Sequence, residues 1–200
     1  MNNREILIKI LLFLRSNGIN NDKILFALEK LPPHYFENLL GTYGNYKQSY
    51  FDEIVRLLKI LQDAVSNKKK INNVLISNFK LGWFLGISAL LGKRIYSISD
   101  NKEKINNLDK VFNHLKLTNI YIKKSTNFLD WKNVAPFDII ILFKNYKVLP
   151  TECTKLLDRN GILFFAKENI NKVSIIKYNK KNNLEKLKIN DFFLKDTKIL

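Results

Sequence analysis

A strand, a turn, a helix and a second strand are predicted between Val74 and Asp100. Residues 74–77 form a short apolar run, and residues 82–91 are apolar at nearly every position. Residues 94–98 form a second run rich in β-formers. A strand, a crossover helix and a parallel strand in about thirty residues make one βαβ unit. Because ligands of such sheets bind beyond the carboxyl ends of the strands, we expect the polar turn at 78–80 to lie at the ligand site.

Helical periodicity dominates the first 65 residues. Residues 5–16, 23–30 and 50–65 repeat apolar positions at helical spacing. Asn17-Gly18 and Leu31-Pro32-Pro33 are expected to end the first two of these helices. Residues 34–36 should pack as a hydrophobic turn, with His34 as a packing or hydrogen-bonded residue rather than a base. Residues 41–49 show no periodicity, which predicts a loop.

Strands and helices alternate beyond Asp100. A helix is predicted at 102–115, and strands are predicted at 119–123, 137–143 and 162–166. The run 137–143 is apolar on both faces, which is typical of a central strand in a parallel sheet. A short helix is expected at 151–157. Weaker strands are predicted at 173–178 and 192–194, with an exposed hairpin loop at 180–190 between them.

This order predicts an α/β fold with a Rossmann-like, doubly wound and mostly parallel sheet. The 200 residues are expected to form a single domain. Residues 1–65 would supply an N-terminal helical extension with a substrate-side loop, and residues 66–200 would supply the Rossmann-like core.

The formal net charge of +16 favours a polyanionic partner such as nucleic acid, a ribosome or an anionic membrane surface. A compositional origin is the preferred explanation, because Asn, Lys and Ile are frequent along the whole chain. Lysine also predominates over arginine, whereas planar phosphate recognition favours arginine. A nucleic-acid partner therefore stays open but is not favoured.

Several kinds of site are not expected. Cys153 is the only cysteine, so no intrachain disulfide can form and a cysteine-based metal site is not expected. His34 and His114 lack the spacing of metal ligands, and neither a phosphate loop nor a nucleophile elbow is found. The apolar run 6–14 is too short to span a bilayer and lacks a signal-peptide cleavage site. We expect a cytoplasmic protein with no metal and no transmembrane segment.

Three blocks of sequence point to one known family. The first block holds Gly18-Ile19, Asp22, Ala27, Leu31-Pro32 and Phe36; the second holds Tyr43-Gly44 and Gln48; the third holds Trp131, Ala135-Pro136-Phe137-Asp138, Leu149-Pro150 and Asn160-Gly161. In this order and spacing, spread over residues 15–166, the blocks resemble the protein-L-isoaspartate O-methyltransferases.

The resemblance implies a class I methyltransferase fold, with S-adenosylmethionine as methyl donor. It implies isoaspartyl residues of damaged proteins or peptides as the acceptor carboxylates. Laid on the family pattern, the donor site comprises Asn78, Gly82, Trp83, Asp100 and Thr126.

The same resemblance assigns the loop before residue 50 to the substrate. Tyr43 and Gly44 would shape the substrate mouth. Lys47 and Gln48 would be the catalytic-loop positions. A carboxylate is already a nucleophile, so alignment of the reacting groups and exclusion of water are the main tasks expected of the protein.

The donor loop departs from the family pattern. Its first two glycines are replaced by Asn78 and Lys80, and the acid that ends the second strand falls on Ser99, with Asp100 one place late. One interpretation is a working methyltransferase with an altered pocket. The alternative is a catalytically inactive relative that serves as a binding module. A nucleic-acid methyltransferase is a third hypothesis, but the chain has no Asn-Pro-Pro-Tyr type of base-holding motif.

Overall fold

The computed structural model describes residues 3–40, 48–68, 70–77, 79, 81–169, 172–180 and 183–186. The N-terminal elements are four helices, α1 (Asn3–Ser16), α2 (Asp22–Lys30), α3 (Pro33–Leu40) and α4 (Gln48–Ser66). The elements that follow are β1 (Asn73–Ser77), α5 (Gly82–Leu91), β2 (Arg94–Ser99), α6 (Lys102–His114), β3 (Ile120–Lys124), the 3₁₀-helix η1 (Phe128–Val134), β4 (Phe137–Tyr146), α7 (Thr151–Leu156), β5 (Leu157–Asn169), β6 (Lys172–Asn179) and β7 (Asn183–Lys186).

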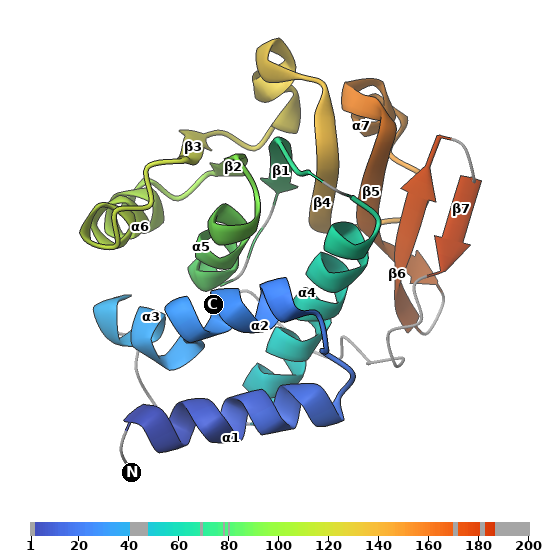
Figure 1. Cartoon of the computed structure of the whole chain (residues 1–200). Coiled ribbons are helices and arrows are strands. Elements are labelled where there is room, and N and C mark those ends of the chain that lie inside the picture. Colours follow the sequence, from blue (N-terminus) through green and yellow to red (C-terminus); the bar gives the residue numbers. More distant parts are fainter. Residues whose placement is uncertain are drawn as a thin grey trace.

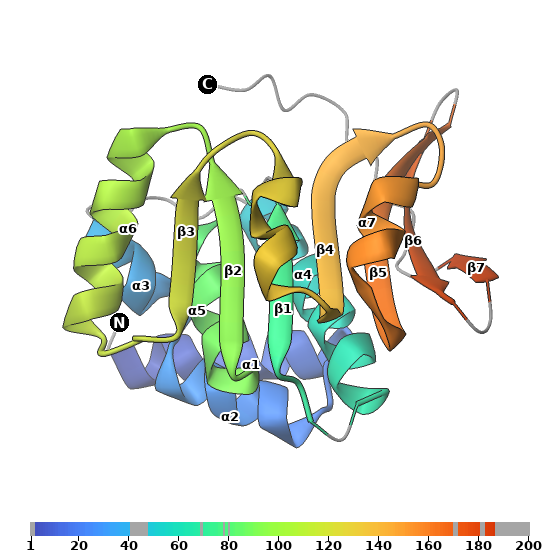
Figure 2. The same cartoon turned by 90° about the horizontal axis from the view of Figure 1, so that it is seen from above.

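The described strands form one seven-stranded sheet in the order β3-β2-β1-β4-β5-β6-β7. Strands β1 to β5 pair in parallel, and β6 and β7 pair antiparallel. Figure 1 shows α1 to α4 packed together beside this sheet. In Figure 2, η1 and α7 lie in front of the sheet, and α5 and the N-terminal helices lie behind it. The predicted α/β fold, its βαβ unit and the helical N-terminal extension are thus confirmed.

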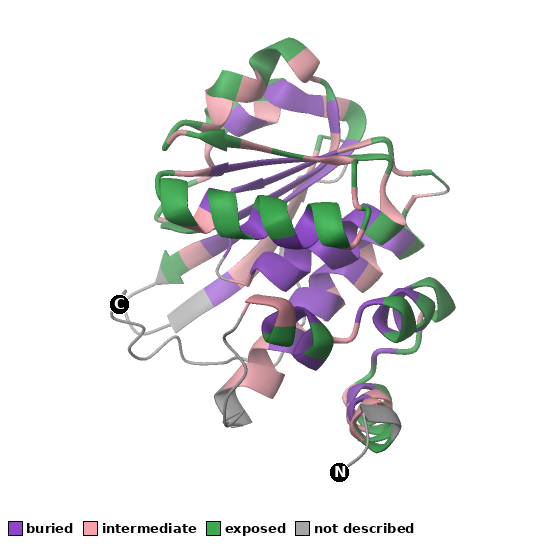
Figure 3. Cartoon of the chain, turned by 90° about the vertical axis from the view of Figure 1, so that its left-hand side faces the viewer, coloured by how far each residue is buried: buried purple, intermediate pink, exposed green. Residues whose placement is uncertain are grey.

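The central strands are buried on both faces. Alternate residues of β1 and β4 belong to two apolar clusters, one shared with α1 to α6 and one shared with η1 and α7. Figure 3 shows the strands as a buried layer and the exposed faces of the helices turned outward. Each such side chain contributes about 1.5–3 kcal/mol when it is fully buried. The first cluster takes Val74, Ile76, Ile139 and Ile141, and the second takes Leu75, Ile140 and Leu142.

The turn between α1 and α2 is held against α4 by the side chain of Gln62. Its Oε1 accepts from the backbone N–H groups of Asn20 and Asn21 at 2.8 and 3.0 Å, and its Nε2 donates to the Gly18 carbonyl at 2.9 Å. Gly18 has φ +84°, a conformation that glycine adopts without strain. The turn between α1 and α2 is therefore anchored to α4 by polar as well as apolar contacts.

Two sequence predictions are wrong, and one element was not predicted. Residues 34–36 lie in helix α3, because Pro33 starts this helix in addition to following the previous one. The segment 180–190, expected to be a loop, contains strand β7, which pairs with β6. The 3₁₀-helix η1 was not predicted. The strand expected at 192–194 lies outside the described residues. Over the described ranges, no helix is both long and apolar enough to cross a membrane.

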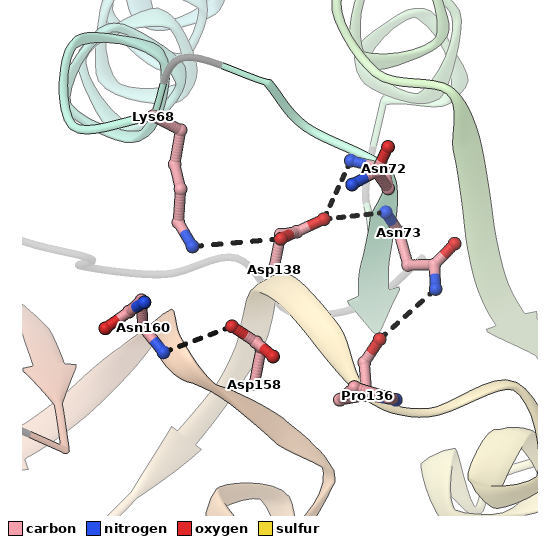
Figure 4. Close-up of polar contacts among 7 residues, drawn as sticks. All are labelled: Lys68, Asn72, Asn73, Pro136, Asp138, Asp158 and Asn160. Carbon is pink, nitrogen blue, oxygen red and sulfur yellow. Dashed lines mark hydrogen bonds and ion pairs between the residues drawn. The ribbon is translucent and has the colours of Figure 1, made fainter.

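Asp138 joins the amino ends of β1 and β4 (Figure 4). Its carboxylate accepts from the backbone N–H groups of Asn72 at 2.7 Å and Asn73 at 3.0 Å. The Lys68 ammonium lies 3.8 Å from the other carboxylate oxygen. This aspartate is part of the family-like block around Phe137, and at this edge it supports the sheet, on the side opposite the carboxyl ends of the strands.

We predict that Asp138→Asn lowers the free energy of unfolding by about 1–3 kcal/mol, because it removes charge-assisted hydrogen bonds to two backbone N–H groups. Urea unfolding followed by circular dichroism measures this change. Asp109→Asn, on an exposed position of α6, is the matched control and should change the value by less than about 0.5 kcal/mol. Equal effects of the two variants would contradict the assignment.

His34 is a packing residue, as the sequence predicts. It is buried in α3, and within the described residues its Nδ1 has no hydrogen-bond partner. Burial lowers the pKa of His34 from its ordinary value of 6.5, because the charged imidazolium is poorly solvated there.

This lowered pKa predicts acid sensitivity. Below about pH 6.5 the unfolded chain binds a proton at His34 that the folded chain does not yet bind. The unfolding free energy should therefore fall with pH, by at most about 1.4 kcal/mol per pH unit from this residue. In urea unfolding at pH 7.5, 6.5 and 5.5, His34→Leu should flatten the dependence. An unchanged slope in the variant would show that His34 is not responsible.

Candidate functional site

The carboxyl ends of β1, β2 and β3 meet at one edge of the sheet. The Ser125 N–H donates to the Ser99 carbonyl at 2.9 Å, which joins the ends of β2 and β3. Asp100 and Thr126 follow these two strand ends, and both are exposed. Because β1 lies between β2 and β4, the chain changes direction at β1, and such a switch point is the usual place for a ligand in an open α/β sheet.

Helix α5 begins at this edge with Gly82. The N-cap residue Leu81 makes no side-chain capping bond, and the positive end of the helix dipole lies at this edge. Gly82 is buried, and a Cβ atom there would collide with Cδ2 of Leu108 on α6. A larger residue would force the Leu108 side chain to move, so the close packing of α6 on α5 favours glycine here whether or not a ligand is bound.

Trp83 lies in the core. Its side chain is fully buried, and its indole N–H donates to the Leu31 carbonyl at 2.8 Å. This bond ties the first turn of α5 to the junction of α2 and α3. The structure therefore gives Trp83 a packing role, and its side chain is not among the residues that line the pocket described below.

The turn after β1 is closed by Phe79 and Lys104. Phe79 is buried, and the Lys104 Nζ donates to its carbonyl at 2.9 Å. The same ammonium lies 4.3 Å from the centroid of the Phe79 ring, in a cation–π arrangement. Burial lowers the pKa of Lys104, and the nearby Asp100 carboxylate acts in the opposite direction.

An apolar pocket lies beside this turn, between α4 and the late residues of β4 and β5. About 60 Å³ of it is open to water-sized molecules. Its polar residues are Glu53 and Arg56 of α4, which form an ion pair at 2.8 Å. The wall is made by Leu57, Ile60, Phe79, Leu81, Phe84, Phe143, Ala166 and Ile175.

The predicted site residues are distributed as follows. Asp100, Thr126 and Gly82 lie at the carboxyl edge of the sheet, and their role in donor binding stays a prediction. Gln48 is the first residue of α4. Tyr43, Gly44, Lys47 and Asn78 lie outside the described residues, so their assignments stay predictions.

Sequence reasoning missed four residues at this edge. Phe79 and Lys104 close the turn, and Glu53 and Arg56 line the pocket. The sequence held one indication of the contact between Phe79 and Lys104, because Phe79 is a large apolar residue in an otherwise polar turn. Across the described residues, no group of three or more His, Cys, Asp or Glu side chains could hold a metal ion.

The sheet order and the helices on both faces define a protein with the class I methyltransferase fold. A crystal structure of a protein-L-isoaspartate O-methyltransferase from Plasmodium falciparum, in complex with S-adenosyl-L-homocysteine, matches it with a TM-score of 0.68 at 18% identity. The match covers 96% of this chain and 95% of that chain, so the N-terminal helices are included.

Two sequence relatives carry the same name. A protein-L-isoaspartate O-methyltransferase from Maricaulis maris is 25% identical over 185 residues, covering 86% of this chain and 84% of that protein. One from Dictyoglomus thermophilum is 29% identical over 165 residues, covering 78% and 73%. No family model matches the chain. The chain is thus similar, in sequence and in fold, to the protein-L-isoaspartate O-methyltransferases.

If Trp83 packs in the core and does not contact the ligand, its substitution should change stability but not ligand affinity. Trp83→Phe keeps an aromatic ring but removes the buried bond to Leu31, and it should lower the unfolding free energy by about 1–3 kcal/mol. The affinity for S-adenosylhomocysteine, measured by calorimetry on the folded variant, should stay within about twofold of wild type. A large loss of affinity without loss of stability would restore Trp83 to the donor site.

Proposed function

We propose that this chain is a protein-L-isoaspartate O-methyltransferase, which transfers a methyl group from S-adenosylmethionine to isoaspartyl carboxylates of damaged proteins. The supporting observation is the extent of the similarity. Relatives with this name align over 78–86% of the chain. The alignment therefore includes more than the general methyltransferase core, and it favours the specific activity over methyl transfer in general.

The polarity of the carboxyl edge supports S-adenosylmethionine as the donor. The N-terminus of α5 lies at this edge, and a helix N-terminus favours a negatively charged group such as the carboxylate of the donor. Asp100 and Thr126 would hold the nucleoside side, and Asn78 and Gly82 would lie along the methionine side. When bound, the donor supplies an electrophilic methyl group. One contact opposes this fit, because Lys104 lies on Phe79 between the β1 turn and α6.

The residues around the pocket provide the conditions that methyl transfer to a carboxylate requires. The acceptor needs no strong base, so positioning and water exclusion dominate. Phe79, Phe84 and Phe143 form an apolar wall that offers no hydrogen-bond partner to water. Glu53 and Arg56 neutralise each other and therefore do not repel an anionic substrate. Tyr43 and Gly44 remain the proposed substrate mouth, and Lys47 and Gln48 remain the proposed catalytic-loop positions.

A second candidate function is a binding module that holds a protein partner without a methyl donor. The contact between Lys104 and Phe79 favours it, because that contact fills space next to the donor turn. In both cases the partner is a polypeptide, and we infer a cytoplasmic protein. A polyanionic partner remains a prediction from the charge of +16 alone.

The test combines donor binding with methyl transfer. Purified protein should bind S-adenosylhomocysteine in calorimetry, and it should transfer radiolabelled methyl groups to an isoaspartyl peptide. The same peptide with ordinary aspartate is the control and should stay unlabelled. Binding without transfer to the isoaspartyl peptide would contradict the acceptor, and no binding at millimolar ligand would leave the binding module as the function.

A further inference from the structure

Lys104 of α6 interacts with two parts of the proposed donor site. Its ammonium contacts Phe79 in the turn after β1, and it interacts electrostatically with Asp100 after β2. Its ammonium contacts Phe79 twice, at the carbonyl (2.9 Å) and over the ring (4.3 Å to the centroid). Two contacts with one residue hold the ammonium over the turn.

Local structure explains why Lys104 reaches the turn after β1. Asn101 caps α6, and its Oδ1 accepts from the Lys104 N–H at 2.8 Å, so Lys104 lies in the first turn of the helix, next to the end of β2. Phe79 is 5% exposed, and its ring lines the apolar pocket. The ring is therefore the fixed partner, while the lysine side chain is the movable one.

The charge of Lys104 adds to the steric effect. S-adenosylmethionine carries a positive sulfonium, and a like charge in a poorly solvated crevice disfavours it. Asp100 compensates only in part, because it is exposed and follows the end of β2 by one position. Its interaction with Lys104 opposes the burial effect that lowers the pKa of the lysine.

We propose that Lys104 competes with the methyl donor for this crevice, so that the donor binds only when the lysine leaves Phe79. The proposal rests on the proposed function, since it takes S-adenosylmethionine as the donor. A ligand that must displace a side chain binds more weakly, by the free energy of the contact that the side chain gives up. Lys104 thus sets the donor affinity of this chain.

Calorimetry with S-adenosylhomocysteine tests the competition on the full chain. Lys104→Ala should bind at least about tenfold more tightly than wild type, because the contact no longer has to be broken. Lys102→Ala is the matched control. Lys102 is exposed on the same helix and its removal deletes the same charge, so this variant should stay within about twofold of wild type.

A second measurement follows the lysine directly. In ¹³C-labelled protein, the ε-methylene signals of Lys104, assigned by their loss in Lys104→Ala, should be shifted upfield by the Phe79 ring. Saturating S-adenosylhomocysteine should return them to the position of exposed lysines. Signals that stay shifted in the complex would overturn the proposal.

The outcomes separate the proposal from the function on which it rests. Equal affinity of the three proteins, or weaker binding by Lys104→Ala, overturns the competition and leaves the proposed function standing. Absence of binding by all three at millimolar ligand overturns the competition together with the donor.

Discussion

The burial of β1 and β4 on both faces is the constraint on which the rest of the structure depends. The central segments 74–76 of β1 and 139–142 of β4 are apolar at every position, so they must be covered by helices on each side, and parallel pairing supplies those helices through the crossovers. The N-terminal helices complete the cover on one face, and η1 and α7 cover the other. The crevice at the carboxyl ends follows from this arrangement and does not require any particular ligand.

The fold was largely predictable because periodicity reports burial directly. The strands around Val74, Ile95 and Ile140 were found from their apolar runs, and the structure pairs them as adjacent parallel strands. Helix α3 was missed because proline ends one helix and equally starts another, and only the three-dimensional path decides between the two. Strand β7 was missed because a polar, charged segment can still pair at the edge of a sheet.

The site was less predictable, for a physical reason. A contact such as that between Lys104 and Phe79 joins residues 25 apart, and no periodicity describes it. For Trp83, the sequence predicted a ligand contact that the structure does not show. The family pattern places an aromatic residue beside the donor turn, but the indole N–H of Trp83 is buried against Leu31. The apolar packing of the core is therefore predictable from the family pattern, whereas the polar residues of the donor loop differ from that pattern.

The bond between Trp83 and Leu31 also bears on how the chain can be divided. It joins residues 52 apart, across the boundary between the helical extension and the sheet. If the extension were separated from the sheet, an indole N–H and its carbonyl would have to find new partners, and the apolar wall of α5 would face water. A working version of this protein therefore needs the helices around Leu31 as well as the sheet, and a fragment reduced to the strands and their crossover helices is expected to aggregate.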